Sequence, residues 1–151
     1  MSNTNEVYEI QDLNDARLHI IMDIWHRAVQ HTYNFIKGPD IITMRPTVLK
    51  NLREMDHIYG VNDDRGNLVA FMCIKGDHIM QLFVEPFHMR NGMGSALVEH
   101  AVNQLGVKLV VVNEENNNAM QFFRARGWAM RNRNLFDEFH LPYPVVVLYH
   151  E

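Results

Sequence analysis

Apolar positions spaced three and four residues apart predict four amphipathic helices. The first follows a cap at Asp12 or Asn14 and carries Leu18, Ile21, Met22, Trp25 and Val29. The second is expected after a turn over residues 37–40, with Pro46 in its first turn and Leu49, Leu52 and Met55 on one face. The third runs from Gly94 to about Gln104 and ends at Gly106. The fourth follows Asn116 or Asn117 and ends at Gly127.

Runs of β-branched and aromatic residues predict the strands between and around these helices. A short alternating segment at residues 7–10 is the first. Residues 57–61, 68–74 and 79–84 are joined by short Gly-containing turns, which predicts an antiparallel meander. Residues 107–112 are almost all β-branched, as in a strand buried on both faces. Residues 128–136 and 145–149 complete a mixed α/β sheet of about seven strands with about four helices.

Composition adds bounds on the class of protein. The chain has 151 residues, 47% hydrophobic and 21% charged, which predicts one globular domain over residues 1–151. No apolar run approaches a membrane span and no signal sequence is evident, so a cytoplasmic location is expected. The net charge of −4 argues against a nucleic-acid partner and suits a cationic acceptor. The single Cys73 lies in an apolar run and is expected to be a buried, inert thiol.

The segment from Ile79 to His100 carries the clearest chemical signal. Its strand ends at Pro86, and Gly92 and Gly94 then let the backbone turn with its amides exposed before a helix begins. Free N–H groups at a helix start bind anions, so a phosphate-bearing cofactor is predicted. A P-loop is excluded because no Gly-Lys-Ser/Thr occurs. A dinucleotide fingerprint is excluded because Leu97 replaces the third Gly and the turn does not directly follow the strand.

Two motifs together resemble the acetyl-coenzyme A-dependent N-acetyltransferases related to the histone acetyltransferase Gcn5, the GNAT family. The loop Met89-Arg90-Asn91-Gly92-Met93-Gly94-Ser95 is similar to the family's pyrophosphate loop, Gln/Arg-x-x-Gly-x-Gly/Ala, with Met89 at the Gln/Arg position. Residues 113–128 are similar to the family's Asn-x-x-Ala-x-x-Phe-Tyr-x-x-x-Gly-Phe segment. The whole pattern resembles small bacterial members that acetylate amines, including protein lysines. The resemblance implies a sheet that splays apart between its fourth and fifth strands.

The resemblance also implies where acetyl-coenzyme A binds. Its pantetheine arm would lie in the splay as a pseudo-strand bonded to the backbone of Leu82, Phe83 and Val84, with the Leu82 N–H polarising the thioester carbonyl. Its pyrophosphate would lie on the loop described above. Asn116 would bond the pantetheine arm, or act as a plain helix cap, and Phe123 would pack against that arm. The arginines at 124, 126, 131 and 133 are either close to the adenosine 3′-phosphate or a solvated basic face.

Catalytic residues are expected from the same resemblance. His78, four residues before Leu82 and expected on the same face of the strand, is the candidate general base. The family's usual thiolate-protonating Tyr is Phe123 here, so Tyr143 is a candidate donor, or else an ordinary turn residue. Trp25, Tyr33, Phe35 and Tyr143 are the candidate acceptor-binding residues, although Trp25 also fits the core. No metal site is expected, because the nine His show no ligand spacing.

The resemblance therefore implies an N-acetyltransferase that transfers acetyl directly to a primary amine. The acceptor would be a protein lysine, an N-terminal amine or a small amine. A non-catalytic acyl-coenzyme A sensor is the alternative, because Phe123 lacks the hydroxyl. A monomer and a homodimer through the last strand's edge both fit the sequence.

Overall fold

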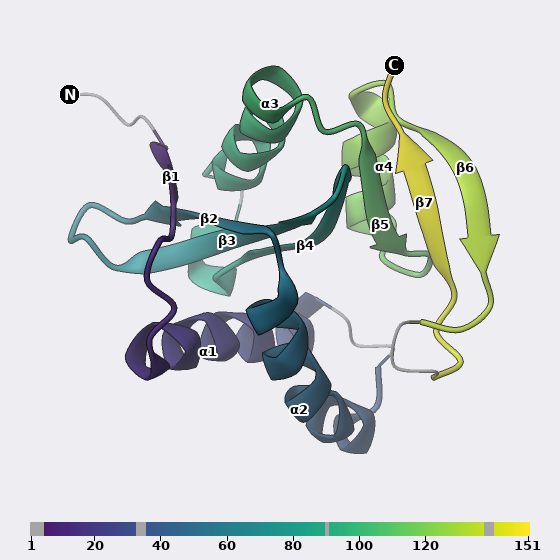
Figure 1. Ribbon diagram of the computed structural model, residues 1–151. Helices are drawn as coiled ribbons and strands as arrows, with labels where there is room; N and C mark the ends of the chain where they lie inside the picture. The colour runs from purple at the N-terminus through teal and green to yellow at the C-terminus, as the bar shows by residue number, and fades with distance from the viewer. Residues whose placement is uncertain (1–4, 33–35, 90, 138–140) are drawn as a thin grey trace.

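Seven strands form one sheet in the order β1-β2-β3-β4-β5-β7-β6 (Figure 1). The computed structural model describes residues 5–32, 36–89, 91–137 and 141–151. The strands are β1 (Val7–Glu9), β2 (His57–Asn62), β3 (Leu68–Lys75), β4 (His78–Val84), β5 (Leu109–Asn113), β6 (Ala129–Asn134) and β7 (Val145–Tyr149). Only the β4–β5 pair is parallel. The mixed, mostly antiparallel sheet predicted from the sequence is confirmed.

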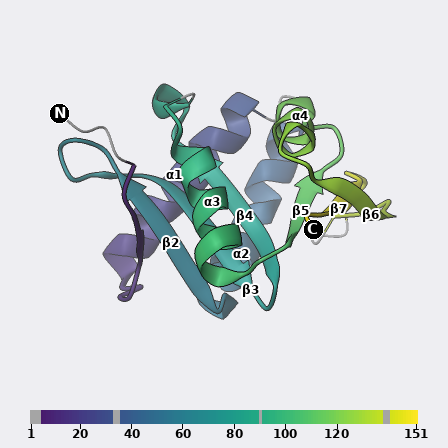
Figure 2. The same cartoon turned by 90° about the horizontal axis from the view of Figure 1, so that it is seen from above.

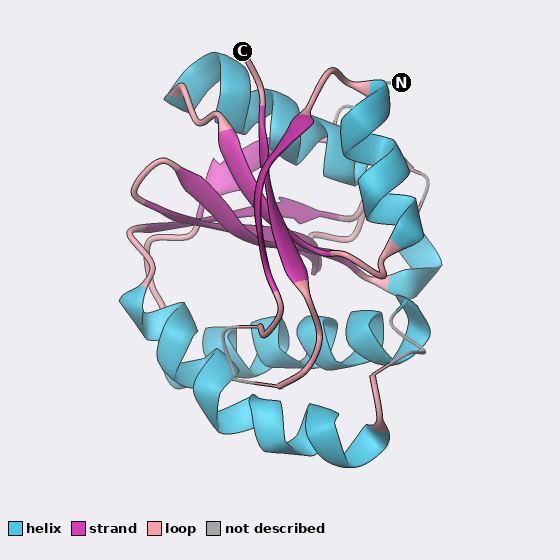
Figure 3. Cartoon of the chain, turned by 90° about the vertical axis from the view of Figure 1, so that its right-hand side faces the viewer, coloured by secondary structure: helices cyan, strands magenta, loops and turns pink. Residues whose placement is uncertain are grey.

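Helices lie on both sides of the sheet and bury its two faces (Figures 2 and 3). They are α1 (Asp15–Thr32), α2 (Gly38–Glu54), α3 (Met93–Leu105) and α4 (Asn117–Ala125), with a short 3-10 turn, η1 (Pro86–His88). Helices α1 and α2 pack with Phe71 in one apolar cluster, and α3 and α4 pack with Met72 in another. Phe71 and Met72 are adjacent and fully buried, as expected for a central strand with a core on each face.

Capping residues place three helix ends as the sequence predicted. The Asn14 side chain accepts the Arg17 N–H at 2.8 Å before α1, and Asn116 accepts the Ala119 N–H at 3.1 Å before α4. Gly106 has a φ of +67°, a left-handed conformation that ends α3. Within the described residues, no helix combines the length and the apolar character needed to cross a membrane.

The start of α2 differs from the prediction. The segment at residues 37–40 is not a separate turn, because the Lys37 carbonyl already accepts the N–H groups of Asp40 and Ile41. Pro39 lies in the first turn, where a missing N–H costs nothing, so it starts the helix. Pro46 lies inside the helix instead. It cannot donate to the Ile42 carbonyl, and the 67% exposed Ile42 side chain marks this as the solvent side.

A bulge in β4 lies at the point where the sheet opens. Gln81 lies opposite Cys73 and Ile79 lies opposite Ile74, so Met80 is an extra residue in β4. On its other side, β4 pairs with β5 only at His78 and Ile79. The two strands diverge beyond that point, which confirms the splay expected between the fourth and fifth strands.

Candidate acetyl-coenzyme A site

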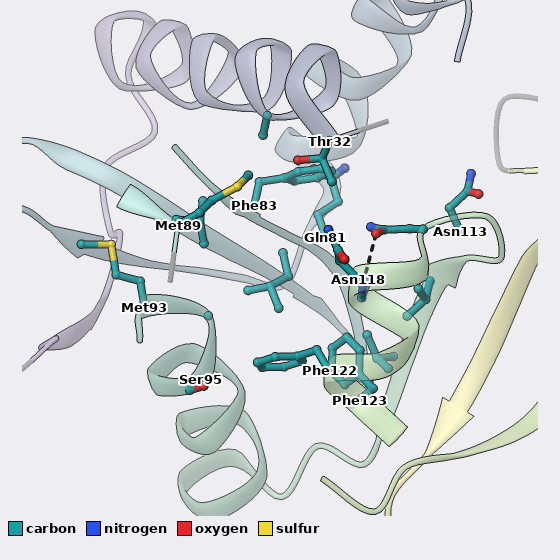
Figure 4. A pocket seen from close by; sticks show the side chains of 18 of the residues that line it. Thr32, Gln81, Phe83, Met89, Met93, Ser95, Asn113, Asn118, Phe122 and Phe123 are labelled. Atoms are coloured by element: carbon teal, nitrogen blue, oxygen red, sulfur yellow. Dashed lines mark hydrogen bonds between the residues drawn. The ribbon is translucent and has the colours of Figure 1, made fainter. Parts of the chain in front are cut away.

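A cleft of about 1000 Å³ lies between the diverging strands (Figure 4). One wall is β4 from Met80 to Val84, and the opposite wall is β5 from Val110 to Asn113. The C-terminal end of α1, the N-terminal end of α3 and one side of α4 line the remainder. The splay therefore provides a binding site in the middle of the sheet rather than on its surface.

The β4 wall presents backbone groups that have lost a strand partner. The Glu85 N–H donates to the Val69 carbonyl at 2.7 Å, so this amide points toward β3. Since successive amides of a strand point in opposite directions, the N–H groups of Leu82 and Val84 point the other way, into the cleft. Both residues line it. An extended ligand can hydrogen-bond here as an added strand would.

The start of α3 presents a second set of free amides. Gly92 has a φ of +81° and precedes the helix, and the first helical bond runs from the Ala96 N–H to its carbonyl at 3.0 Å. The N–H groups of Met93, Gly94 and Ser95 thus have no carbonyl within the helix, and all three residues line the cleft. With the helix dipole, these amides make an anion site suited to a pyrophosphate.

The rest of the predicted loop contributes less directly. Met89 lines the cleft, whereas Asn91 does not. The Asn91 carbonyl instead accepts a hydrogen bond from the Asn5 side-chain amide at 2.8 Å. Arg90 lies outside the described residues. A Cβ on Gly92 would approach the same Asn5 amide at 3.2 Å, while a Cβ on Gly94 would meet nothing within 4 Å. Gly94 is therefore open toward the cleft.

An ion pair fixes the segment that leads from β4 into this loop. The Arg27 guanidinium donates from Nε to both carboxylate oxygens of Glu85, at 2.8 and 3.0 Å, and from Nη2 to one of them at 2.7 Å. The hydrogen bond to Glu85 raises the pKa of Arg27 above its ordinary value. Arg27 lies on α1 and Glu85 directly follows β4, so the pair holds the cleft-lining end of α1 against the strand end.

Helix α4 supplies the side of the cleft nearest β5. Asn116 is 7% exposed and lines the cleft, and its Oδ1 caps the helix. Its side-chain amide can therefore act as the cap and also contact a pantetheine arm in the cleft, the two roles considered from the sequence. Phe123 also lines the cleft and is 3% exposed, with ring centroids 5.1 Å from Phe122 and 5.2 Å from Trp128. No hydroxyl is present at this position.

The four arginines considered in the sequence do not act as one group. Arg126 lines the cleft and donates to the Ser95 hydroxyl at 2.9 Å, which links the end of α4 to the start of α3. Its guanidinium lies 3.7 Å from the Phe122 ring centroid. Arg133 is instead paired with Glu114. Arg126 is the arginine of this set that lies at the cleft.

His78 does not reach the cleft, contrary to the expectation that it shares a face with Leu82. The extra residue Met80 shifts the alternation, so Leu82 packs in the same cluster as Ile79 and His78 projects to the opposite face. His78 also lies where β4 is still paired with β5, and its Nδ1 is 2.9 Å from Asp77. It does not line the cleft. The geometry therefore gives no support to His78 as the base.

Two of the predicted acceptor residues, Trp25 and Tyr143, do not line the cleft. Trp25 is 3% exposed and belongs to the core beneath the sheet, which is the other role that the sequence allowed. Tyr33 and Phe35 lie outside the described residues. Tyr143 is buried, donates its hydroxyl to Asp40 at 2.5 Å and accepts the Lys37 N–H at 3.2 Å. Tyr143 therefore joins the loop before β7 to the start of α2.

The Tyr143 hydroxyl is expected to stabilise the fold rather than to take part in chemistry. Burial, together with the bond to Asp40, raises the pKa of this phenol, so it remains a hydrogen-bond donor at neutral pH. We expect Tyr143→Phe to lower the free energy of unfolding by about 1–3 kcal/mol, because the Asp40 carboxylate loses a donor. Urea unfolding measures the loss. An acetylation rate that falls only in proportion to the folded fraction fits this account, and a large loss of kcat in fully folded protein contradicts it.

His31, Thr32 and Gln81 are among the polar residues at the cleft that were not identified from the sequence. His31 and Thr32 line the cleft from the end of α1, and Gln81 lines it from β4. Figure 4 shows Thr32 and Gln81 at the cleft. One signal for Gln81 was present, since it is a polar residue within an otherwise apolar strand. His31 and Thr32 lie between the predicted acceptor residues Trp25 and Tyr33, but the sequence did not single them out, because a helix end gives no indication of which of its side chains meets a distant strand. Among the described residues, no cluster of His, Cys, Asp and Glu is placed to hold a metal ion.

The fold and the cleft define an acyl-coenzyme A-dependent acetyltransferase, and the chain belongs to the GNAT family. A family model for the acetyltransferase (GNAT) domain matches residues 54–129. The chain is 31% identical over 128 residues to the peptidyl-lysine N-acetyltransferase YjaB of Escherichia coli strain K12, covering 85% of this chain and 86% of that protein. It is 26% identical to the peptidyl-lysine N-acetyltransferase YiaC of the same strain, covering 88% and 91%.

Solved structures agree with this assignment. The solution structure of apo YjaB from Escherichia coli superposes with a TM-score of 0.82, at 25% identity and 96% coverage of both chains. The PaiA N-acetyltransferase from Thermoplasma acidophilum, solved in complex with coenzyme A, has the same fold, with a TM-score of 0.68 at 14% identity, covering 97% of this chain and 99% of that one. The exposed β4 amides and the α3 start fit the cofactor that this family uses. The protein is therefore an acetyl-coenzyme A-dependent acetyltransferase.

Proposed function

We propose that the protein transfers acetyl from acetyl-coenzyme A to the side-chain amine of a lysine in a peptide or protein, by direct attack of the amine on the thioester. The observation that carries the proposal is the cleft itself, in which the Leu82 and Val84 amides and the α3 start line one continuous space. The names of the YjaB and YiaC relatives support lysine as the acceptor class.

The chain's own groups would hold the cofactor along this cleft. The amides of Met93, Gly94 and Ser95 would bind the pyrophosphate, and the β4 backbone would bond the pantetheine arm as an added strand. The Asn116 Nδ2 can donate to the same arm while its Oδ1 remains in the cap. The Phe123 ring would pack against the apolar part of the arm. These contacts would place the thioester beside Leu82, just beyond the point where β4 stops pairing with β5.

Acetyl-coenzyme A supplies an acetyl group activated as a thioester. The Leu82 N–H would donate to the carbonyl oxygen and stabilise the negative charge that develops there. The amine nitrogen bonds to the carbonyl carbon, the carbon–sulfur bond breaks, the nitrogen loses a proton, and the thiolate takes one up. The protein therefore needs a group that accepts the proton from the amine.

His31 is our candidate for that group. It lies in the last turn of α1, lines the cleft and is exposed, so it can pass a proton to solvent. Imidazole is the side chain suited to proton transfer near neutral pH. His88 also lines the cleft, but it lies on η1, between β4 and the proposed pyrophosphate loop. We therefore propose that His31 accepts the amine proton, directly or through one water.

The leaving thiolate has no hydroxyl donor at position 123, so water would protonate it. We expect Phe123→Tyr to raise kcat by about tenfold, since a positioned general acid accelerates such steps by this much or more. Phe123 already lines the cleft, and this prediction requires that the added hydroxyl face it. Steady-state kinetics with saturating acetyl-coenzyme A measures the effect. An unchanged kcat in a protein of unchanged thermal stability would show that thiolate protonation does not limit the rate.

The proposed function is tested with three peptides of one sequence. The first has a blocked N-terminus and a free lysine, the second has a blocked N-terminus and acetyl-lysine, and the third has a free N-terminus and acetyl-lysine. Mass spectrometry after incubation with acetyl-coenzyme A should show one added acetyl group on the first peptide only. Transfer only to the third peptide would make the protein an N-terminal acetyltransferase. Cofactor binding with no transfer to any peptide or polyamine would favour a sensor.

A further inference from the structure

Two buried oxygen atoms at the cleft have no hydrogen-bond partner among the described residues. They are Oε1 of Gln81 and Oγ1 of Thr32. Gln81 is 7% exposed, and both residues line the same cleft. A buried polar atom without a partner costs about 1–3 kcal/mol, so two such atoms on one cleft indicate a site that a ligand completes.

Both oxygens belong to the same face of the sheet. Gln81 lies opposite Cys73, and Cys73 packs in the cluster that α1 and α2 form beneath the sheet. Thr32 is the last residue of α1. Figure 4 shows the two side chains on the side of the cleft where the end of α1 meets β4. The next residue of β4 is Leu82, whose amide would polarise the thioester, so Gln81 is adjacent to the proposed site of reaction, and Thr32 lines the same cleft.

The charges of the side chains that line the cleft indicate which form of an amine this site would bind. Among the described residues that line the cleft, none is Asp or Glu. A carboxylate would favour the ammonium form of an acceptor, which cannot attack. Uncharged oxygens bind N–H groups without that effect. A neutral primary amine has two N–H bonds and one lone pair, so two uncharged acceptors satisfy both N–H groups and leave the lone pair free.

We propose that Gln81 and Thr32 bind the attacking nitrogen of the acceptor, each accepting one N–H of the neutral primary amine. This inference rests on the function proposed above and adds the groups that select its reactive form. The third proton of an ammonium ion finds no acceptor in this pair and leaves to His31 or to water. The lone pair is then directed at the thioester carbon held by the Leu82 amide.

The test uses near-isosteric apolar variants, Gln81→Met and Thr32→Val, with Gln30→Met as the matched control on the exposed face of α1. Loss of one hydrogen bond to the amine should raise the KM for the lysine peptide about tenfold in each cleft variant, with the acetyl-coenzyme A Kd unchanged. The melting temperature should stay the same or rise, because an unpartnered buried oxygen is removed. A residue with only a structural role would lower the melting temperature without this change in KM.

The outcomes separate this inference from the proposed function. If the parent protein acetylates the lysine peptide and Gln81→Met keeps the parent KM and kcat, the inference is wrong and the function stands. If the parent acetylates no amine, the proposed function is wrong. Calorimetric titration of the lysine peptide into coenzyme A-saturated protein then decides the inference. Binding weakened in Gln81→Met but not in Gln30→Met supports the amine site, and equal or absent binding overturns it.

Discussion

Gly94→Asp is expected to weaken acetyl-coenzyme A binding by at least about 100-fold, which corresponds to about 2.7 kcal/mol. A Cβ on Gly94 would meet no neighbouring group within 4 Å and Gly94 lines the cleft, so we expect the substitution to leave the fold intact and to extend into the cleft. Its carboxylate would occupy the anion site formed by the first amides of α3, where it both fills the space and repels the pyrophosphate. Isothermal titration calorimetry measures the loss.

Gly38→Asp is the matched control for this experiment. A Cβ on Gly38 would likewise meet no protein atom within 4 Å, its φ is not positive, and it begins α2, outside the cleft. The same charge and size are thus added at a helix start that the cofactor does not use. Equal binding by the parent and both variants would place the pyrophosphate somewhere other than the start of α3.

His31→Ala is expected to reduce kcat for the lysine peptide by about 100-fold, at the lower end of what a positioned base contributes. The acetyl-coenzyme A Kd should not change, because His31 lies at the end of α1 and the pyrophosphate site is at the start of α3. His31 is exposed, so added imidazole can enter the vacated space and should restore part of the rate. Steady-state kinetics with and without imidazole measures both effects.

His78→Ala is the control that distinguishes the base expected from the sequence from the base proposed from the structure. The sequence favoured His78 as the base, whereas the structure turns it away from Leu82 and leaves it outside the cleft. We expect its replacement to change kcat by less than about threefold, since a base must lie within hydrogen-bond reach of its substrate or of one water. A large loss for His78→Ala with little for His31→Ala would reverse our assignment.

The difference between these two histidines shows the limit of what the sequence predicts. The strand containing Leu82 was identified from its β-branched and aromatic residues. The bulge at Met80, however, could not be predicted from the local sequence pattern. One inserted residue exchanges the two faces of a strand, so His78 and Leu82 were wrongly assigned to the same face. The register depends on β3, and it becomes visible only when the two strands are paired.

Long-range contacts could not be predicted from the sequence, for a related reason. Tyr143 bonds Asp40 across 103 positions, and Arg27 bonds Glu85 across 58. Each residue has several chemically suitable partners, and only the packed fold selects one. In contrast, the Gly92–Gly94 loop and the Asn116 cap were predicted correctly, because glycine and helix-capping residues act within one turn of the chain.

The most direct test of the central claim is an NMR titration of the isotope-labelled protein with acetyl-coenzyme A. Our account predicts that the largest amide shifts occur at Leu82 and Val84 on β4 and at Met93, Gly94 and Ser95 at the start of α3. These are the residues whose N–H groups face the cleft without a strand or helix partner. Saturable binding that leaves these five amides unshifted, or no binding at all, would contradict the account.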